Sequence, residues 1–193
     1  MKKLFFLSAL LLASIAMNAE VRTVPVGSDL QAAINGASSG DQVKVQAGTF
    51  TGNFTMKDGV NVSGGWDAEF KTQTDYATIL DAQANGRVVN QPAAFSTLTV
   101  WSNFTIQNGK LTAQPADKGA AGVFLNVKGR VQDCLIQNNV VDATVTAETA
   151  GGGVCCNSGT ADPDTVAYNC VIKNNTATHG GGVRVNGEGI VIY

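Results

Sequence analysis

The side chains of this sequence that could hold a metal ion or move a proton are acidic residues and arginines of its second half. Carboxylate oxygens are the ligands that calcium prefers, and an arginine or lysine on the same face could act as a base. The residues of this kind are Arg130, Asp133, Asp142, Glu148, Asp162, Asp164 and Arg184. Because they are scattered over separate segments, we interpret them as solvated loop charges. The sequence therefore predicts no catalytic residue and no metal ligand, and calcium is the only cofactor kept as an alternative.

Histidine and cysteine give no stronger signal. His179 is the only histidine, and we interpret it as a loop residue before the glycine-rich corner Gly180–Gly182. The four cysteines all lie beyond residue 133 and show no CxxC…CxxC pattern, so a zinc site is not expected. A nucleophilic cysteine needs a nearby base, and the sequence places none beside them.

The first 19 residues are predicted to be a signal peptide. Lys2 and Lys3 precede an apolar run from Leu4 to Ala16, which is too short to span a bilayer comfortably. Cleavage is expected after Ala16 or after Ala19, and we expect no transmembrane helix in the mature segment. Without the two lysines the formal net charge changes from −2 to −4, which offers no basic face to nucleic acid. We expect an exported bacterial protein, located at the cell surface or outer membrane or released from the cell.

Residues 20–40 are predicted to contain a strand followed by the only convincing helix. Val21–Val26 is the strand, and residues 28–39 are the helix, with Ser28 as N-cap and Gln31 completing a capping box. The apolar stripe of this helix consists of Leu30, Ala33, Ile34 and Ala37, and Gly40 ends it.

Beyond Asp41 the hydrophobic period becomes two, which indicates short β-strands. The clearest are Val43–Val45, Val60–Val62, Thr78–Leu80 and Leu98–Val100, each bounded by Gly, Asn or Asp. The chain has 22 glycines but only four prolines, a composition that suits many tight corners. Strands this short, with turns this frequent, are typical of a sandwich, a barrel or a solenoid.

Internal repeats favour the solenoid. Segments 103–109, 133–139 and 169–175 align without gaps, and so do segments 122–126, 153–157 and 182–186. Both sets recur in the same order, which predicts two strands and two loops per cycle. The expected inward side chains are Phe104, Ile106, Cys134, Ile136, Cys170 and Ile172 in the first set, and Val123, Leu125, Val154, Cys156, Val183 and Val185 in the second. Those expected to point outward are Thr105, Gln107, Phe124, Cys155, Lys173 and Arg184.

Two columns of asparagine and one pair of cysteines follow from the same alignment. The predicted ladders are Asn108, Asn138 and Asn174 after the first strand, and Asn126, Asn157 and Asn186 after the second. Cys134 and Cys170 occupy the same inward position on successive cycles. We favour stacked buried thiols, with a strained disulfide as the alternative.

Several segments of the sequence resemble those of known protein families. The segments 30–34, 40–45, 47–50 and 60–65 are similar to the N-terminal cap and first coils of pectate-lyase-like right-handed parallel β-helix proteins. The Ile-x-Asn-Asn and Gly-Gly-Gly-Val pieces resemble repeats of bacterial polymorphic outer-membrane and related surface proteins. The resemblance implies an all-β, right-handed parallel β-helix over residues 41–193, with the short amphipathic helix capping its N-terminal end. Since Gly189–Tyr193 looks like a strand that starts another coil, we expect the β-helix to continue and this chain to be the N-terminal part of a longer protein.

The resemblance is weaker for function, because this fold hosts lyases, hydrolases, esterases and adhesins. Calcium-dependent lyases of the family need clustered carboxylates. Its polygalacturonase-type hydrolases need paired aspartates and a Gly-His-Gly motif, which Thr178 breaks on one side here. We therefore predict a surface or secreted scaffold for adhesion or glycan contact, whose partner is a polysaccharide or a neighbouring cell surface. The alternative is a polysaccharide-active lyase or hydrolase whose active residues lie on the loop face or beyond Tyr193.

Overall fold

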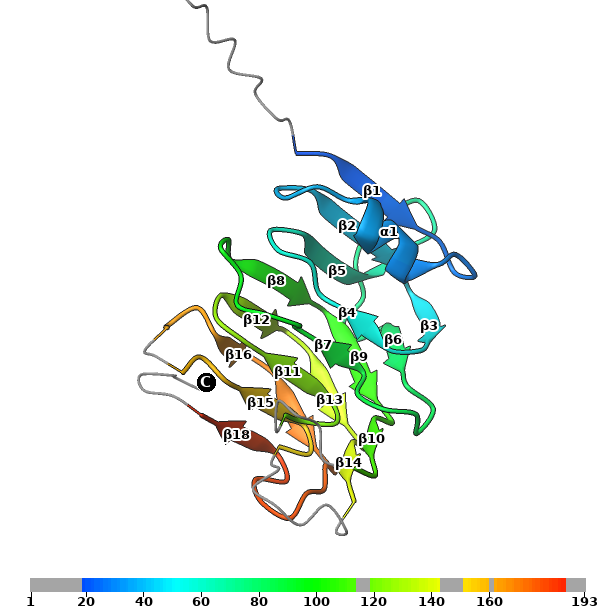
Figure 1. Cartoon of the computed structure of the whole chain (residues 1–193). Coiled ribbons are helices and arrows are strands. Elements are labelled where there is room, and N and C mark those ends of the chain that lie inside the picture. Colours follow the sequence, from blue (N-terminus) through cyan, green and yellow to red (C-terminus); the bar gives the residue numbers. More distant parts are fainter. Residues whose placement is uncertain (1–18, 114–118, 143–150, 160–161, 187–193) are drawn as a thin grey trace, which may run out of the picture.

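The computed structural model describes residues 19–113, 119–142, 151–159 and 162–186, and within them almost all regular structure is parallel β-strand. Three sheets, named A, B and C here, carry most of the strands (Figure 1). Sheet A pairs β1 (Val21–Val24), β2 (Gln42–Gln46), β5 (Asn61–Trp66), β8 (Thr99–Ser102), β12 (Gly129–Gln132) and β16 (Val166–Tyr168) in that order. Sheet B pairs β3 (Gly48–Thr51), β6 (Thr78–Asp81), β9 (Phe104–Gln107), β13 (Leu135–Gln137) and β17 (Val171–Lys173). Sheet C pairs β4 (Phe54–Thr55), β7 (Val89–Asn90), β11 (Val123–Leu125), β15 (Val154–Cys156) and β18 (Val183–Val185), and the short β10 (Lys110–Leu111) pairs with β14 (Val140–Val141).

The described chain contributes strands to sheets A, B and C in the same order five times. We number these cycles 1 (β2, β3, β4), 2 (β5, β6, β7), 3 (β8, β9, β11), 4 (β12, β13, β15) and 5 (β16, β17, β18). Each strand pairs in parallel with the strand of the neighbouring cycle. The prediction of an all-β chain built from parallel strands is therefore confirmed, and the arrangement is compatible with a β-helix or solenoid.

The prediction of two strands per cycle is wrong, because sheet A contributes a third. β12 and β16 each send one apolar side chain into the main core, Val131 at 0% exposed and Ala167 at 1%. One inward residue per strand leaves no alternating pattern that sequence periodicity could detect.

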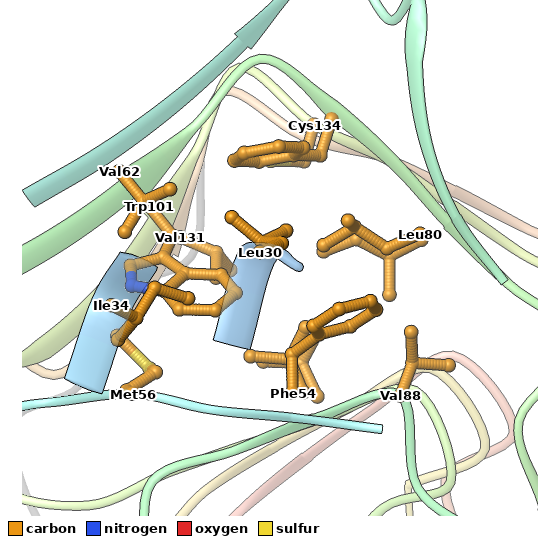
Figure 2. Packing of buried hydrophobic residues seen from close by; sticks show 14 of the residues in the cluster. Leu30, Ile34, Phe54, Met56, Val62, Leu80, Val88, Trp101, Val131 and Cys134 are labelled. Carbon is orange, nitrogen blue, oxygen red and sulfur yellow. The ribbon is translucent and has the colours of Figure 1, made fainter. Parts of the chain in front are cut away.

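The core lies between the three sheets and runs through all cycles (Figure 2). Strand pairing aligns Ile136 with Ile106 and Ile172 in sheet B, and Cys156 with Leu125 and Val185 in sheet C. The inward side chains of cycles 3 and 4 are fully buried: Phe104, Ile106, Val123, Leu125, Cys134, Ile136, Val154 and Cys156. In cycle 5, Cys170, Ile172 and Val183 are only partly buried and Val185 is 39% exposed.

Three positions expected to face solvent are buried instead. Thr105 donates its hydroxyl hydrogen bond to the Tyr76 carbonyl at 2.9 Å, under the loop that follows β5. Phe124 and Cys155 point away from the main core but form a second buried cluster with Ala120. The Arg87 guanidinium lies over the Phe124 ring at 4.7 Å, so a cation–π contact helps to cover this outer patch of sheet C.

The helix α1 (Leu30–Gly36) is shorter than predicted, and its N-cap lies one residue after the predicted one. Asp29, not Ser28, is the N-cap, and its carboxylate accepts the Ala32 N–H at 2.9 Å. Gln31 does not close a capping box. Its amide accepts from the Thr55 N–H at 2.7 Å and donates to the Thr55 carbonyl at 3.2 Å, so it pairs with the edge strand β4. Leu30 and Ile34 are buried and belong to the main core cluster (Figure 2). No described helix is long and apolar enough to cross a membrane.

Two columns of Asn and Asp residues turn the chain at the ends of the sheet B strands. Asn103, Asp133 and Asn169 precede these strands with φ of 61°, 53° and 48°, and Asn108, Asn138 and Asn174 follow them with φ of 58°, 56° and 55°. Asn and Asp adopt this left-handed conformation at less cost than other residues with a side chain, which explains why the repeat keeps them.

Side-chain amides are stacked at two corners, and only one of these stacks contains the predicted residues. Asn186 donates to the Asn157 side-chain oxygen at 2.7 Å, and Asn157 to that of Asn126 at 3.5 Å. At the corner after sheet B, the linked residues are Asn139 and Asn175, one position beyond the predicted column.

Asn139 is fully buried and uses both ends of its amide. Its oxygen accepts the Gly109 N–H at 2.8 Å, and its nitrogen donates to the Ile106 carbonyl at 3.2 Å and the Asn175 side-chain oxygen at 3.0 Å. The glycine before the sheet C strand in each of cycles 3 to 5 makes room for this ladder. A Cβ on Gly122 would lie 2.3 Å from the Gly153 carbonyl and 2.9 Å from the Asn139 amide nitrogen.

Candidate functional site: a polar ladder beside two grooves

The outer face of sheet B presents one polar side chain from each cycle. The strand register aligns Thr51, Asp81, Gln107, Gln137 and Lys173. Because side chains alternate along a strand, residues aligned in this way share one face of the sheet. The residue before each of them in the strand points inward, and Ile106 and Ile136 at these positions are fully buried. Their packing in the core fixes the position of the outer face.

Hydrogen bonds join three of these side chains into a chain across cycles 2 to 4, which we call the polar ladder. Gln137 Nε2 donates to Gln107 Oε1 at 3.0 Å, and Gln107 Nε2 donates to Asp81 Oδ2 at 2.9 Å. Asn108 Nδ2, at the neighbouring corner, donates to the same Asp81 oxygen at 2.8 Å. The amides and the carboxylate are therefore held in fixed orientations on the surface.

Asp81 is held in its charged form. Partial burial by itself would raise its pKa, but hydrogen bonds from the Gln107 amide, the Gln83 N–H and the Asn108 amide together lower the pKa below the ordinary value. A carboxyl group in this state is an acceptor for donor groups and is poorly suited to act as a general acid.

Two grooves adjoin the polar ladder at the corner that follows sheet B. The first has a volume of about 290 Å³ and is lined by Asp81, Asn108, Lys110 and Asn138, among others. The second, of about 310 Å³, is lined by Lys110, Val140, Asp142 and Thr178, among others. Both include Lys110 and Val140, so they adjoin along the stack from cycle 2 to cycle 5. That span is about 14 Å at the usual spacing of paired strands.

The charged residues singled out from the sequence do not meet at one place. Arg130 pairs with Asp164 at 3.1 Å, Asp162 binds the Lys128 N–H at 2.7 Å, and Asp133 accepts from Asn169 at 2.6 Å. Arg184 lies beside Cys155 in the register of sheet C, and Asp142 lines the second groove. Glu148 lies outside the described residues. Across the described ranges, no three His, Cys, Asp or Glu side chains form a group that could hold a metal ion.

His179 is exposed, and its carbonyl accepts the Gly151 N–H at 3.1 Å. The backbone of His179 thus takes part in a hydrogen bond between cycles 4 and 5.

The four cysteines form no disulfide. Cys134 and Cys170 are neighbours in the stack, since the Val171 N–H donates to the Cys134 carbonyl at 2.8 Å. Their thiols donate to the Gln132 carbonyl at 3.1 Å and the Tyr168 carbonyl at 3.2 Å. Burial raises the pKa of Cys134, and it raises that of Cys156 to about 12, so both stay as thiols at neutral pH.

The polar ladder and the grooves were not found from the sequence. Asp81 follows a predicted strand in cycle 2, but the repeat alignment began only at residue 103, so its register with Gln107 and Gln137 was not visible. Extending the alignment one cycle toward the N-terminus, through Thr78–Asp81, is the signal that could have found it.

The carboxylates predict how stability depends on pH. The pKa values of Asp41, Asp67 and Asp81 lie below the ordinary value, chiefly because backbone N–H groups and side-chain donors bind their charged forms. The unfolded chain therefore binds protons first as the pH falls. We expect the free energy of unfolding to be at its full value near neutral pH and to decrease from about pH 5 downward through the folded pKa values.

Urea unfolding followed by circular dichroism at a series of pH values checks this expectation. Asp81→Asn should remove part of the loss on acidification. Hydrogen bonds, not ion pairs, lower the pKa of Asp81. Its contribution to the loss of stability at low pH should therefore persist in about 0.5 M salt. A stability that stays level down to pH 3 would contradict the assignment.

Comparison with protein-family models, curated protein sequences and solved structures finds no match to this chain.

Proposed function

We propose that this chain is an exported right-handed parallel β-helix that serves as a stiff scaffold and contacts glycans through the polar ladder and its grooves. The fixed order of sheets A, B and C and the all-parallel pairing support the β-helix. The buried Leu30 and Ile34, together with the bonds of Gln31 to the edge strand β4, support a capping role for α1. The apolar leader sequence supports export, and a secreted product that begins at Met17 or Glu20 on N-terminal sequencing tests it.

The observation that carries the glycan contact is the polar ladder. Sugar hydroxyl groups both donate and accept hydrogen bonds, and amides and carboxylates complement them. Side chains already fixed by Gln137–Gln107 and Gln107–Asp81 bonds lose little conformational entropy on binding. The grooves follow the stack, so an extended polymer can contact several cycles at once. Lys110, whose ammonium group makes no ion pair with the described residues, adds a cation where the grooves meet.

Gln137→Ala is expected to weaken binding of the purified full chain to a recognised polysaccharide at least about tenfold. The substitution removes one end of the ladder without touching the core. Binding is measured by calorimetry against a set of soluble neutral and acidic polysaccharides. Gln132→Ala is the matched control, because Gln132 is a partly buried glutamine on sheet A rather than sheet B. An equal loss in both variants, or no binding by the unaltered chain, would argue against a glycan contact on sheet B.

The same polysaccharides test the enzymatic alternative. They are incubated with the protein with and without calcium, and new unsaturated or reducing ends are measured. We expect none to form. Chain cleavage that follows protein concentration would replace the scaffold proposal with a lyase or hydrolase.

A further inference from the structure

Two cysteines lie at the same corner of neighbouring cycles, where the chain enters sheet B. Cys134 precedes β13 and Cys170 precedes β17, and these two strands pair in parallel and in register. The Val171 N–H donates to the Cys134 carbonyl at 2.8 Å, so the two cysteines are stacked on one another. Paired strands lie about 4.8 Å apart, a Cα separation that falls inside the range of disulfides.

The two sulfur atoms face the same small space at the edge of the main core. The Cys134 thiol donates to the Gln132 carbonyl at 3.1 Å and the Cys170 thiol to the Tyr168 carbonyl at 3.2 Å, two residues earlier in each case. The Cys170 sulfur also lies 3.7 Å from the Val131 carbonyl of cycle 4. The two thiols are in hydrogen-bonding contact with each other as well, so they need no movement of the backbone to meet.

The two thiols differ in accessibility and in acidity. Cys134 is fully buried, and burial raises its pKa. Cys170 is only partly buried, and the hydrogen bond from the Cys134 thiol lowers its pKa. Because the thiolate is the form that attacks a disulfide, Cys170 is the thiol that reacts first with an external reagent. Cys134 lies behind it, in position to attack a disulfide formed on Cys170.

The other two cysteines do not form a comparable pair. Cys155 and Cys156 are adjacent in β15, but Cys156 belongs to the main core and Cys155 to the outer cluster with Phe124. Consecutive residues of a strand point to opposite faces of the sheet, so these two sulfur atoms are kept apart. Among the four cysteines of the chain, Cys134 and Cys170 are therefore the stacked pair.

We propose that Cys134 and Cys170 form a reversible disulfide between cycles 4 and 5, made by exchange with a disulfide-carrying oxidant. The Cys170 thiol loses its proton, and its sulfur attacks one sulfur of the oxidant, whose other sulfur leaves and takes up a proton. The Cys134 sulfur then attacks the Cys170 sulfur, and its own proton passes to the second leaving thiolate. The oxidant is thereby reduced to two thiols.

The bond joins cycle 5, whose inward side chains are only partly buried, to the fully buried cycle 4. Because the side chains of stacked residues are parallel, the bond is strained, and a mild dithiol is expected to reduce it. Oxidants of this kind act outside the cytoplasm, so the inference rests on the export in the proposed function. It does not rest on the glycan contact, and the two can fail separately.

Oxidation of the reduced full chain by oxidised glutathione, followed by peptide mapping without reduction, tests the proposal. We expect one linked pair of peptides that contains Cys134 and Cys170, a mass lower by two hydrogen atoms, and recovery of both thiols with dithiothreitol. Four thiols that remain after this treatment would overturn the proposal. A link that involves Cys155 or Cys156, or one that joins two copies of the chain, would overturn it as well.

Three substitutions test the order of attack. Cys134→Ala should stop the reaction with one glutathione bound through Cys170, whereas Cys170→Ala should react at least about tenfold more slowly than the unaltered chain. Cys156→Ala is the matched control, because it removes a buried thiol of sheet C and should leave the rate of bond formation unchanged. Equal capture of glutathione by Cys134 and Cys170 would overturn the assigned order. If Cys134→Ala fails to fold, Cys134→Ser, which keeps the size of the side chain, replaces it.

Discussion

Phe104→Ala is expected to lower the free energy of unfolding by about 3–5 kcal/mol. The Phe104 ring is fully buried in the main core, 6.1 Å from the Trp101 ring between centroids. It also lies against Gly64 of the preceding cycle, where a Cβ would approach the ring to 2.7 Å. Removal of the ring leaves a cavity that neighbouring cycles cannot fill, because their strands are fixed by pairing on both sides.

Urea unfolding of the full chain measures this loss, with Phe70→Ala as the control. Phe70 lies in the loop after β5, is partly exposed and has a φ of 56°. Its replacement is expected to cost less than about 1 kcal/mol. Equal costs for the two phenylalanines would mean that Phe104 is not part of a packed core.

Asn139→Leu is expected to lower the free energy of unfolding by about 3–5 kcal/mol, although leucine has nearly the same volume as asparagine. The substitution leaves the Gly109 N–H and the Ile106 carbonyl without their side-chain partner in a buried site. The Asn175 side-chain oxygen loses the bond from the amide but keeps the one from the backbone N–H of residue 139 at 3.0 Å. Each buried polar group left unpaired costs about 1–3 kcal/mol.

Asn157→Leu is the matched control for the buried ladder. Asn157 also joins stacked amides, but it is only partly buried, so its former partners can bind water. We expect a cost of about 1 kcal/mol or less, measured as the shift of the urea midpoint. If Asn157→Leu proved as costly as Asn139→Leu, burial would not be the source of the effect.

The strand pattern of this fold could be predicted where alternate residues are apolar over several positions. The sheet B and sheet C strands of cycles 3 to 5 were located in this way. β12 and β16 could not be, since Val131 and Ala167 are their only side chains in the main core. The predicted N-cap of α1 was one residue too early, because Ser28 and Asp29 are both good N-caps. Only the observed hydrogen bond from the Ala32 N–H to the Asp29 carboxylate distinguishes them.

The asparagine ladder shows a different limit of prediction. The repeat contains two consecutive asparagines, Asn138 and Asn139, and the sequence favoured the first. A positive φ at Asn138 turns the chain so that the second enters the interior. The equivalent of Asn139 in cycle 3 is Gly109, so the column that forms the buried ladder is incomplete in sequence and looks less regular than the exposed one.

The covering of outer surfaces could not be predicted at all. Phe124 and Cys155 sit at outward positions of sheet C, yet Ala120 and the Arg87 guanidinium enclose them. The contact between Arg87 and Phe124 joins residues 37 positions apart that no sequence repeat relates. The polar ladder was missed for a related reason, since it includes a cycle that the aligned repeats did not reach.

Because strands pair only with the strands one cycle away, the length of the molecule can change in whole units. Gain or loss of one complete cycle, about 30 residues, would lengthen or shorten the rod by roughly 4.8 Å and leave the remaining contacts in register. A change of one or two residues inside a strand would instead turn core side chains outward. Length variants of this protein in nature should therefore differ by multiples of a cycle or within the loops.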